Sequence, residues 1–214
     1  MRWVVFIKYD PQFQSIIDLK GKTFGITRFG GGSHINTVLL AKDQGWLVNQ
    51  NEEQGNNIRI EPVGDLNSLV NAIRKGIIDC FIWESPSISF LLDSGILRAI
   101  GEVHPSWPCF MVAATTDFIE MSSNQIKSVL DSIHGAAKIF HSEVDYSLGI
   151  MKKIYKPSED ACQRFMKSVK YSTGGKISKK VLKETMTTLS NVGAISKVAN
   201  VSNIIFPYFS TTTD

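Results

Sequence analysis

The sequence predicts an α/β protein whose first half forms a mostly parallel sheet. Short apolar or β-branched runs alternate with amphipathic helical patterns up to about residue 115. Beyond that position the strand patterns stop, whereas helical periodicity continues. A composition of 43% hydrophobic and 20% charged residues among 214 is typical of a packed globular protein. Strands and helices that alternate at this spacing imply right-handed crossovers, which place neighbouring strands in parallel.

Six strands are expected in the first half, most of them short apolar or β-branched runs bounded by Gly, Pro or Asp. They cover residues 3–8, 23–28, 58–63, 77–83, 97–103 and 110–115. The polar stretch 49–57 is expected to be a surface loop.

Two helices are expected between these strands, and both have recognisable ends. Ser33 is a candidate N-cap of the first helix, and Gly45 lies where a left-handed residue would end it. Asp65 is the corresponding N-cap of the second helix, which Gly76 would end. Such caps are expected because Ser and Asp side chains accept hydrogen bonds from the free amides of a first helical turn.

The second half is expected to be helical. Apolar residues follow a helical period in 126–140, in 161–169 and in 181–189. These helices could form a small bundle, but a bundle explains neither the strand-like start of the chain nor the apolar tail at 201–209. We therefore expect them to pack against a sheet.

The main candidate site is the loop between the second strand and the first helix. Gly30, Gly31 and Gly32 allow backbone angles that other residues avoid. The helix that begins at Ser33 directs free amides and the positive end of its dipole to the same place, which suits an anionic or polar ligand. Ligands of open parallel sheets bind beyond the carboxyl ends of the strands, where this loop lies. The alternative is a glycine turn that serves only the chain geometry.

Arg28 and His34 flank this loop. Arg28 can pair with a carboxylate, sulfonate or phosphate, or it can simply lie over the sheet surface. His34, in the first helical turn, can donate to a ligand or be an ordinary half-exposed histidine. The glycines are consecutive and no Lys-Ser/Thr pair follows them, so neither a P-loop nor a dinucleotide fingerprint is present.

A second candidate site lies where the strand at 77–83 ends. Trp83 can supply an aromatic wall and Glu84 a hydrogen-bond acceptor at the same edge of the sheet. A core tryptophan followed by a helix-capping glutamate is the alternative. Trp107 precedes the last predicted strand, where it can line a cleft or pack as an ordinary hinge residue.

No catalytic residue, metal site or cofactor is predicted. Cys80 lies in an apolar strand and should be an inert thiol, Cys109 has no orienting group, and the spacing to Cys162 does not suit zinc. Cysteine usage mildly favours a reducing, cytoplasmic compartment. The net charge of +3 is spread without an arginine cluster, and no apolar run is long enough to span a membrane. Neither nucleic-acid binding nor membrane insertion is therefore expected.

The sequence resembles a known family at these residues. The resemblance is carried by Asp-Leu-Lys-Gly-Lys at 18–22, Thr-Arg-Phe-Gly-Gly-Gly-Ser-His at 27–34 and Asp-Cys-Phe-Ile-Trp-Glu at 79–84. Gly-Glu-Val at 101–103 and Trp-Pro-Cys at 107–109 extend it. In order and spacing these motifs resemble the alkanesulfonate, taurine and thiamine-pyrimidine-precursor binding proteins, which have the type II periplasmic-binding-protein fold. The likeness covers residues 1–116 and is weaker beyond.

The resemblance implies two α/β lobes with a small ligand in the cleft between them. Residues 12–107 would form one ligand-binding lobe, whereas 1–11 and 108–214 would supply hinge strands and the helices of the other lobe. Family members carry a strand-rich segment before the first hinge strand. The resemblance therefore implies an incomplete first lobe, completed by a missing segment or by another copy of the chain.

The function implied is binding of a small polar or anionic solute, as in the substrate-binding components of ABC importers. A thiamine-pyrimidine-precursor biosynthetic enzyme on the same fold, and the sensor domain of a transcription regulator, are the alternatives. The family loop usually has a hydroxyl residue where this sequence has Gly31, which weakens the case for a sulfonate. The three scattered cysteines do not reproduce the cysteine-rich motif of the fungal synthases, so no synthase activity is carried over.

Overall fold

The computed structural model describes residues 3–47, 58–84, 88, 91–92, 95–105, 107–108, 110–155 and 158–213. The chain divides into two compact units. Unit 1 contains Met1–Pro105 and Pro157–Phe165, and unit 2 contains Ser106–Lys156 and Met166–Asp214. The lobe boundaries inferred from the sequence, at residues 12 and 107, stay a prediction.

Unit 1 is built on a five-stranded mixed sheet. The strands are β1 (Trp3–Lys8), β2 (Thr23–Ile26), β3 (Arg59–Pro62), β4 (Cys80–Glu84) and β5 (Leu97–Val103). Their order in the sheet is β3-β2-β4-β1-β5. β2 runs parallel to both of its neighbours, whereas β1 runs antiparallel to β4 and to β5. The α/β class is thus confirmed, with the difference that the first strand is inserted into the sheet in the opposite direction.

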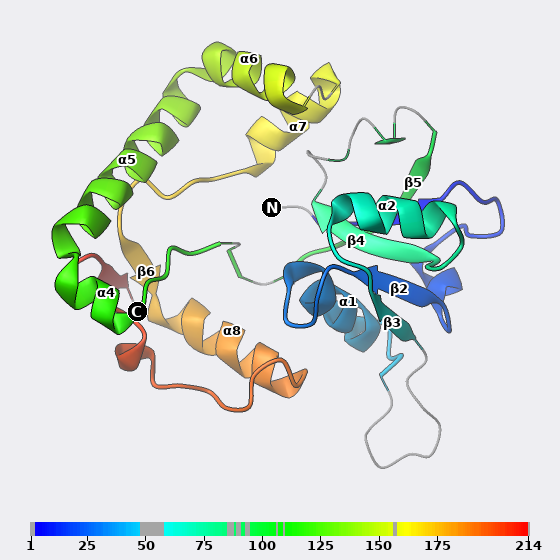
Figure 1. Cartoon of the computed structure of the whole chain (residues 1–214), viewed down its shortest axis with the longest axis horizontal. Helices are drawn as coiled ribbons and strands as arrows, with labels where there is room; N and C mark the ends of the chain where they lie inside the picture. The colour runs from blue at the N-terminus through cyan, green and yellow to red at the C-terminus, as the bar shows by residue number, and fades with distance from the viewer. Residues whose placement is uncertain are drawn as a thin grey trace. The chain divides into compact units, whose positions relative to one another are not determined.

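Two helices cover opposite faces of this sheet (Figure 1). α2 (Leu66–Arg74) packs on one face, because successive strand residues alternate between faces and one set meets this helix. The buried cluster on that face includes Val4, Phe6, Leu69, Ile73 and Phe81. On the other face α1 (Gly32–Asp43) begins against the ring of Trp3. The sheet is therefore buried on both faces, as the apolar strand patterns require.

The helix ends follow the predicted chemistry in most respects. Asp65 caps α2 by accepting a hydrogen bond from the Ser68 amide at 2.8 Å. Gly45 and Gly76 adopt positive φ angles of 66° and 70° after the two helices, as expected. The exception is the N-cap of α1, which is Gly31 rather than Ser33.

The predicted strand at 110–115 is wrong. These residues form no strand, and the side chains of Phe110 and Val112 are 76% and 58% exposed. Phe110 has a φ of 65°, in the left-handed region that a strand residue does not adopt. An apolar run forms a strand only where a neighbouring strand receives its hydrogen bonds, and no strand among the described residues pairs with this one.

Unit 2 is mainly helical, as the sequence predicts. Its helices are α4 (Thr116–Met121), α5 (Ser123–Ser142), α6 (Val144–Tyr155) and α8 (Lys179–Asn191), with a 3₁₀ turn, η3 (Val201–Asn203). α7 (Glu159–Ser168) belongs to unit 1 as far as Phe165. Unit 1 also contains a 3₁₀ turn, η1 (Ile16–Leu19).

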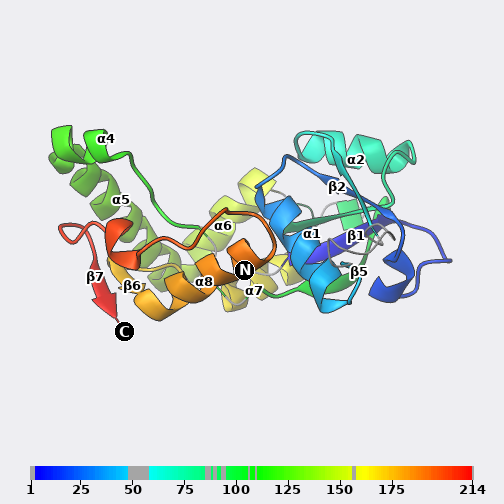
Figure 2. The ribbon, with the colours of Figure 1, turned by 90° about the horizontal axis from the view of Figure 1, so that it is seen from below.

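Among the described residues, the helices of unit 2 are not accompanied by a large sheet within the same unit. Within the described residues its strands are β6 (Lys176–Ser178) and β7 (Thr211–Thr213), which pair in parallel beside the start of α8 (Figure 2). Large apolar side chains remain exposed, among them Met121 at 78% and Ile154 at 62%. The amphipathic helices of unit 2 therefore have apolar side chains that the described structure leaves uncovered.

Candidate functional site

One edge of the unit 1 sheet brings most of the predicted site residues together. The parallel strands β2 and β4 end at this edge with Ile26 and Glu84, and the antiparallel β1 begins there with Trp3. Trp3 is paired with Glu84 on one side and with Val103 on the other. The loop from β2 to α1 starts at the same edge, as expected for a sheet whose ligands bind beyond the carboxyl ends of its strands.

The three glycines of this loop have different roles. Gly30 has a φ of 74°, which non-glycine residues rarely adopt. Gly31 has extended angles, φ −79° and ψ 168°, and caps α1. Gly32 lies against Trp3, because a Cβ placed on it would be 2.7 Å from Cη2 of that ring. Trp3 is only 9% exposed, so Gly32 is the residue that lets the helix begin on the tryptophan.

Several loop groups that the sequence assigns to a ligand are bonded within the protein. The Gly30 amide donates to Nδ1 of His34 at 3.1 Å, and the Gly31 amide donates to the Arg28 carbonyl at 3.2 Å. The Ser33 hydroxyl accepts a hydrogen bond from the Thr27 amide at 3.0 Å and is 3.2 Å from the Thr27 hydroxyl. Ser33 is also buried. These contacts shape the loop, and they do not involve the amides of the first turn of α1.

The remaining donors are the amides of the first turn of α1. Intrahelical bonding begins with the Ile35 amide, which donates to the Gly31 carbonyl at 3.0 Å. The amides of Gly32, Ser33 and His34 precede it and therefore have no partner within the helix. No side chain caps them in the part of the chain that the structure describes. These amides, together with the positive end of the helix dipole, form an arrangement that attracts an anion or a carbonyl oxygen.

The hydrogen bond from the Gly30 amide holds His34 in one tautomer. Its Nδ1 accepts the Gly30 amide proton, so the ring proton of the neutral imidazole is on Nε2. The ring also meets Phe29 edge-on, with centroids 5.2 Å apart. Desolvation by partial burial lowers the pKa of His34 below 6.5. A neutral His34 keeps positive charge away from the positive end of α1.

We expect the His34 ring to titrate below pH 6.5, and the fold to lose this contact in acid. Protonation of Nδ1 removes its acceptor and breaks the bond from Gly30. Because the folded pKa lies below the unfolded one, the stabilisation is complete above the unfolded value and is lost as the pH falls through the folded value. NMR titration of the His34 ring protons measures the midpoint, with the urea-unfolded chain as reference. A folded midpoint equal to or above the unfolded one contradicts the assignment.

Two further residues at this edge were missed by the sequence analysis. Trp3 was recognised only as part of a strand, although its ring lies against the loop. Asn36 is 4% exposed on α1, and its Nδ2 donates to the Gly32 carbonyl at 2.9 Å. Its Oδ1 has no hydrogen-bond partner among the described residues. A polar residue on the buried stripe of a predicted helix was the signal that could have identified Asn36.

Trp83 and Glu84 lie on opposite faces of the sheet. Trp83 packs, half-buried, against the cluster beneath α2, which agrees with its interpretation as a core tryptophan. Glu84 alternates to the other face, where it is the cross-strand neighbour of Trp3. Arg28 is exposed at the start of the loop. Trp107 is half-buried in unit 2, and its part in a site stays a prediction.

The described cysteines and acidic residues form neither a reactive thiol nor a metal site. Cys80 is fully buried, and desolvation raises the pKa of its thiol, as expected for an inert side chain. Cys162 is also buried, and Cys109 lies outside the described residues. Among the described residues no cluster of His, Cys, Asp and Glu is able to hold a metal ion. Within the same residues no helix is both long enough and apolar enough to cross a bilayer.

Comparison with known proteins gives one family match. Residues 6–103 match the model of a family described as Ca3427-like PBP, a segment that begins in β1 and ends with β5. No curated protein matches the chain.

Several solved structures share its architecture. The Candida albicans CA3427 gene product, described as having the generic periplasmic binding protein fold, is 16% identical with a TM-score of 0.74, over 93% of this chain and 65% of its own. The periplasmic aliphatic sulphonate binding protein SsuA from Escherichia coli is 14% identical with a TM-score of 0.65, over 100% and 67%. The alkanesulfonate-binding protein SsuA from Xanthomonas axonopodis pv. citri, bound to MOPS, is 14% identical with a TM-score of 0.69, over 95% and 69%. The chain thus spans about two thirds of the length of these structures.

Proposed function

We propose that this chain binds a small polar or anionic solute where α1 begins, beyond the ends of β2 and β4 in the unit 1 sheet. Its fold is that of the periplasmic binding proteins. The proposed site consists of the first turn of α1, Trp3 and Glu84, with Arg28 at its rim. A sulfonate or a thiamine-pyrimidine precursor is the proposed class of solute. The protein is proposed to act by binding, as a solute-binding component of an importer does, and not as an enzyme.

The observation that carries this proposal is the uncapped first turn of α1. Three successive amides, those of Gly32 to His34, lack a partner among the described residues, beside the ring of Trp3. Natural helices usually satisfy such donors with a capping side chain, with water or with a ligand. Here the serine hydroxyl that could cap them is bonded to Thr27 instead. A glycine at the N-cap brings no side chain that could cap these donors.

A small acidic solute fits the electrostatics of this turn. The helix dipole and the free amides favour negative charge, and Arg28 is an exposed cation within the same loop. The buried ring of Trp3 packs against Gly32, next to these donors. Glu84 adds an acceptor on the same face, which suits a solute that also carries a hydrogen-bond donor. An amino-pyrimidine is uncharged, but its ring nitrogens can accept hydrogen bonds from the amides and its amino group can donate one.

The other part of the proposal concerns unit 2. Its exposed apolar side chains support completion of this lobe by another copy of the chain or by a further segment. The length of the related structures, of which this chain spans about two thirds, supports the same proposal.

A ligand panel tests the function on the 214-residue chain. We expect one class among alkanesulfonates, amino-pyrimidines and small carboxylates to raise the melting temperature in a saturable way. Ligand at a hundred times its dissociation constant stabilises the folded state by about 2.7 kcal/mol. Differential scanning fluorimetry detects the shift, and sodium chloride at equal ionic strength is the control. If none of the three classes shifts the transition beyond this control, the proposal is rejected.

A further inference from the structure

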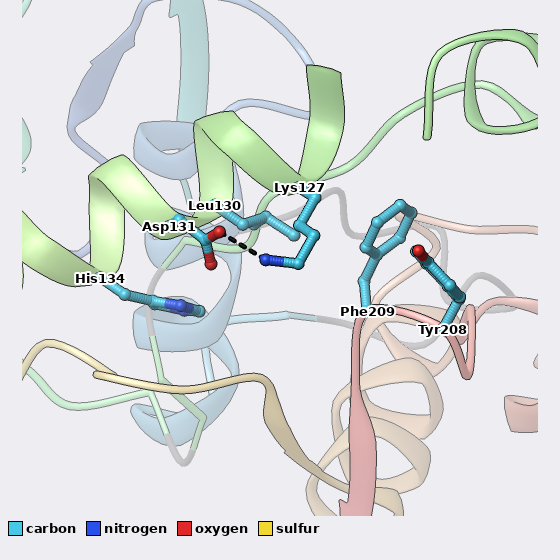
Figure 3. Close-up of a pocket in the computed structure, with 6 residues that line it drawn as sticks. All are labelled: Lys127, Leu130, Asp131, His134, Tyr208 and Phe209. Atoms are coloured by element: carbon cyan, nitrogen blue, oxygen red, sulfur yellow. Dashed lines mark hydrogen bonds and ion pairs between the residues drawn. The ribbon is translucent and has the colours of Figure 1, made fainter. Parts of the chain in front are cut away.

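Unit 2 contains a cavity that is lined by its own residues. Its volume is about 450 Å³, within the range of small-molecule sites. It lies between α5 and the segment that precedes β7 (Figure 3). The lining residues are Lys127, Leu130, Asp131, His134, Tyr208 and Phe209.

The α5 side of the cavity carries three polar side chains. Lys127, Asp131 and His134 are spaced by four and by three residues, which places them on one face of the helix. Nζ of Lys127 donates to Oδ2 of Asp131 at 2.6 Å. Figure 3 shows the imidazole of His134 and the ammonium of Lys127 pointing into the same space. A cation, an anion and an imidazole therefore converge on one small volume.

Both members of this ion pair are charged at neutral pH. The hydrogen bond from Lys127 is the main cause that lowers the pKa of Asp131, and the bond to Asp131 is the main cause that raises the pKa of Lys127. The two side chains are 58% and 62% exposed, so a solute can reach them. An ammonium group and a carboxylate each retain hydrogen-bonding capacity beyond a single shared bond.

Two aromatic rings border the other side. Tyr208 and Phe209 pack edge to face with centroids 4.9 Å apart, and Phe209 also stacks on Phe206 at 5.6 Å. Tyr208 is 66% exposed despite its size. Figure 3 shows Phe209 on the side of the cavity opposite α5, with Tyr208 next to it. An exposed aromatic wall opposite a charged face is a typical way to recognise a ring with a polar end.

We propose that this cavity binds an aromatic α-amino acid. Nζ and Oδ2 are only 2.6 Å apart, so one ligand uses both charges only if its own acid and amine are on neighbouring atoms. An α-amino acid meets this condition, with its carboxylate on Lys127 and its ammonium on Asp131. Its aromatic side chain then stacks on Tyr208 and Phe209. The assignment goes beyond the solute site of unit 1, because it uses other residues in another unit.

Calorimetric titration of the chain with L-phenylalanine tests this assignment. We expect L-phenylalanine to bind saturably. L-Alanine, which lacks the ring, should bind at least about tenfold more weakly. The same loss is expected for 3-phenylpropionate and for phenethylamine, because each lacks one of the two charges. Lys127→Met and Tyr208→Ala should each weaken binding of L-phenylalanine by about tenfold. Asp131→Asn should weaken the binding of L-phenylalanine but strengthen the binding of 3-phenylpropionate, because the substitution removes a negative charge and the ion pair with Lys127.

Two control variants distinguish binding in this cavity from nonspecific attraction to surface charge and from binding at the unit 1 site. Lys138→Met removes an exposed lysine from the same helix and should leave binding unchanged. Gly31→Asp, in the unit 1 loop, should also leave it unchanged. The proposal is overturned if L-phenylalanine gives no saturable heat at millimolar concentration, or if 3-phenylpropionate binds equally well. It is also overturned if Lys138→Met weakens binding as much as Lys127→Met does. Circular dichroism confirms that each variant is folded.

Discussion

Replacing Gly25 by valine is expected to lower the free energy of unfolding of unit 1 by about 3 kcal/mol. Gly25 lies in the middle of β2, on the face covered by α2. A Cβ at this position would be 2.3 Å from Cδ1 of Ile78 and 2.9 Å from Cδ2 of Leu69. Both side chains are fully buried, so neither can move aside without displacing α2 or β4. Urea unfolding followed by tryptophan fluorescence measures the loss, since Trp3, Trp46 and Trp83 all belong to unit 1.

The sign of this effect separates packing from strand propensity. Valine is a better strand former than glycine, so propensity alone predicts that the variant is more stable. A matched control is Gly135→Ala, because a Cβ at Gly135 meets nothing within 4 Å in α5. Removing a glycine from a helix interior should stabilise unit 2 by about 0.5–1 kcal/mol. A Gly25→Val chain as stable as the original would show that β2 and α2 are not packed as described.

Local patterns were sufficient to predict most elements of unit 1. The strands 3–8 and 97–103 agree with β1 and β5 at both ends, and the Asp65 cap is confirmed. These elements are set by neighbouring residues: alternation of apolar side chains, caps and glycines with positive φ. The antiparallel insertion of β1 could not be predicted in the same way. It depends on pairing with strands about eighty to a hundred residues away, which no local pattern encodes.

The difference between local patterns and long-range pairing also explains why residues 110–115 form no strand. That stretch is as apolar as the true strands, but no strand in the described structure pairs with it. The helices of unit 2 are a parallel case, because their amphipathic periods predict helices and not what covers them. Local sequence therefore determines the type of element more reliably than its partner.

The candidate site was partly predictable for a similar reason. A glycine-rich turn between a strand and a helix indicates free amides at the carboxyl end of the strand, and the uncapped turn of α1 agrees with this expectation. Which amides are free could not be predicted. That depends on two side-chain bonds, His34 to Gly30 and Ser33 to Thr27, and on a tryptophan from the first strand.

Gly31→Asp is expected to abolish solute binding at the unit 1 site without unfolding the chain. Gly31 already has the extended backbone angles of an N-cap, so an aspartate can adopt them. Its carboxylate would accept hydrogen bonds from the Ser33 or His34 amide, and its charge would repel an anion. We expect affinity for the solute that emerges from the ligand panel to fall at least about a hundredfold, which is about 2.7 kcal/mol. Isothermal titration calorimetry measures the change.

Stability and binding should separate in this variant, because the added cap favours the helix while it occupies the donors. An aspartate N-cap is a few tenths of a kcal/mol better than glycine. The new Cβ would be 3.2 Å from the Arg28 carbonyl oxygen and from the Thr27 hydroxyl, a contact that the loop can relieve by a small shift. Gly31→Ala is the matched control, since it adds the same Cβ without an acceptor and should retain binding. Gly31→Asn adds an acceptor without a charge. The loss of solute affinity in this variant therefore measures the effect of occupying the amides, without charge repulsion. Binding by Gly31→Asp as tight as by the original chain would show that the solute is not held by the first turn of α1.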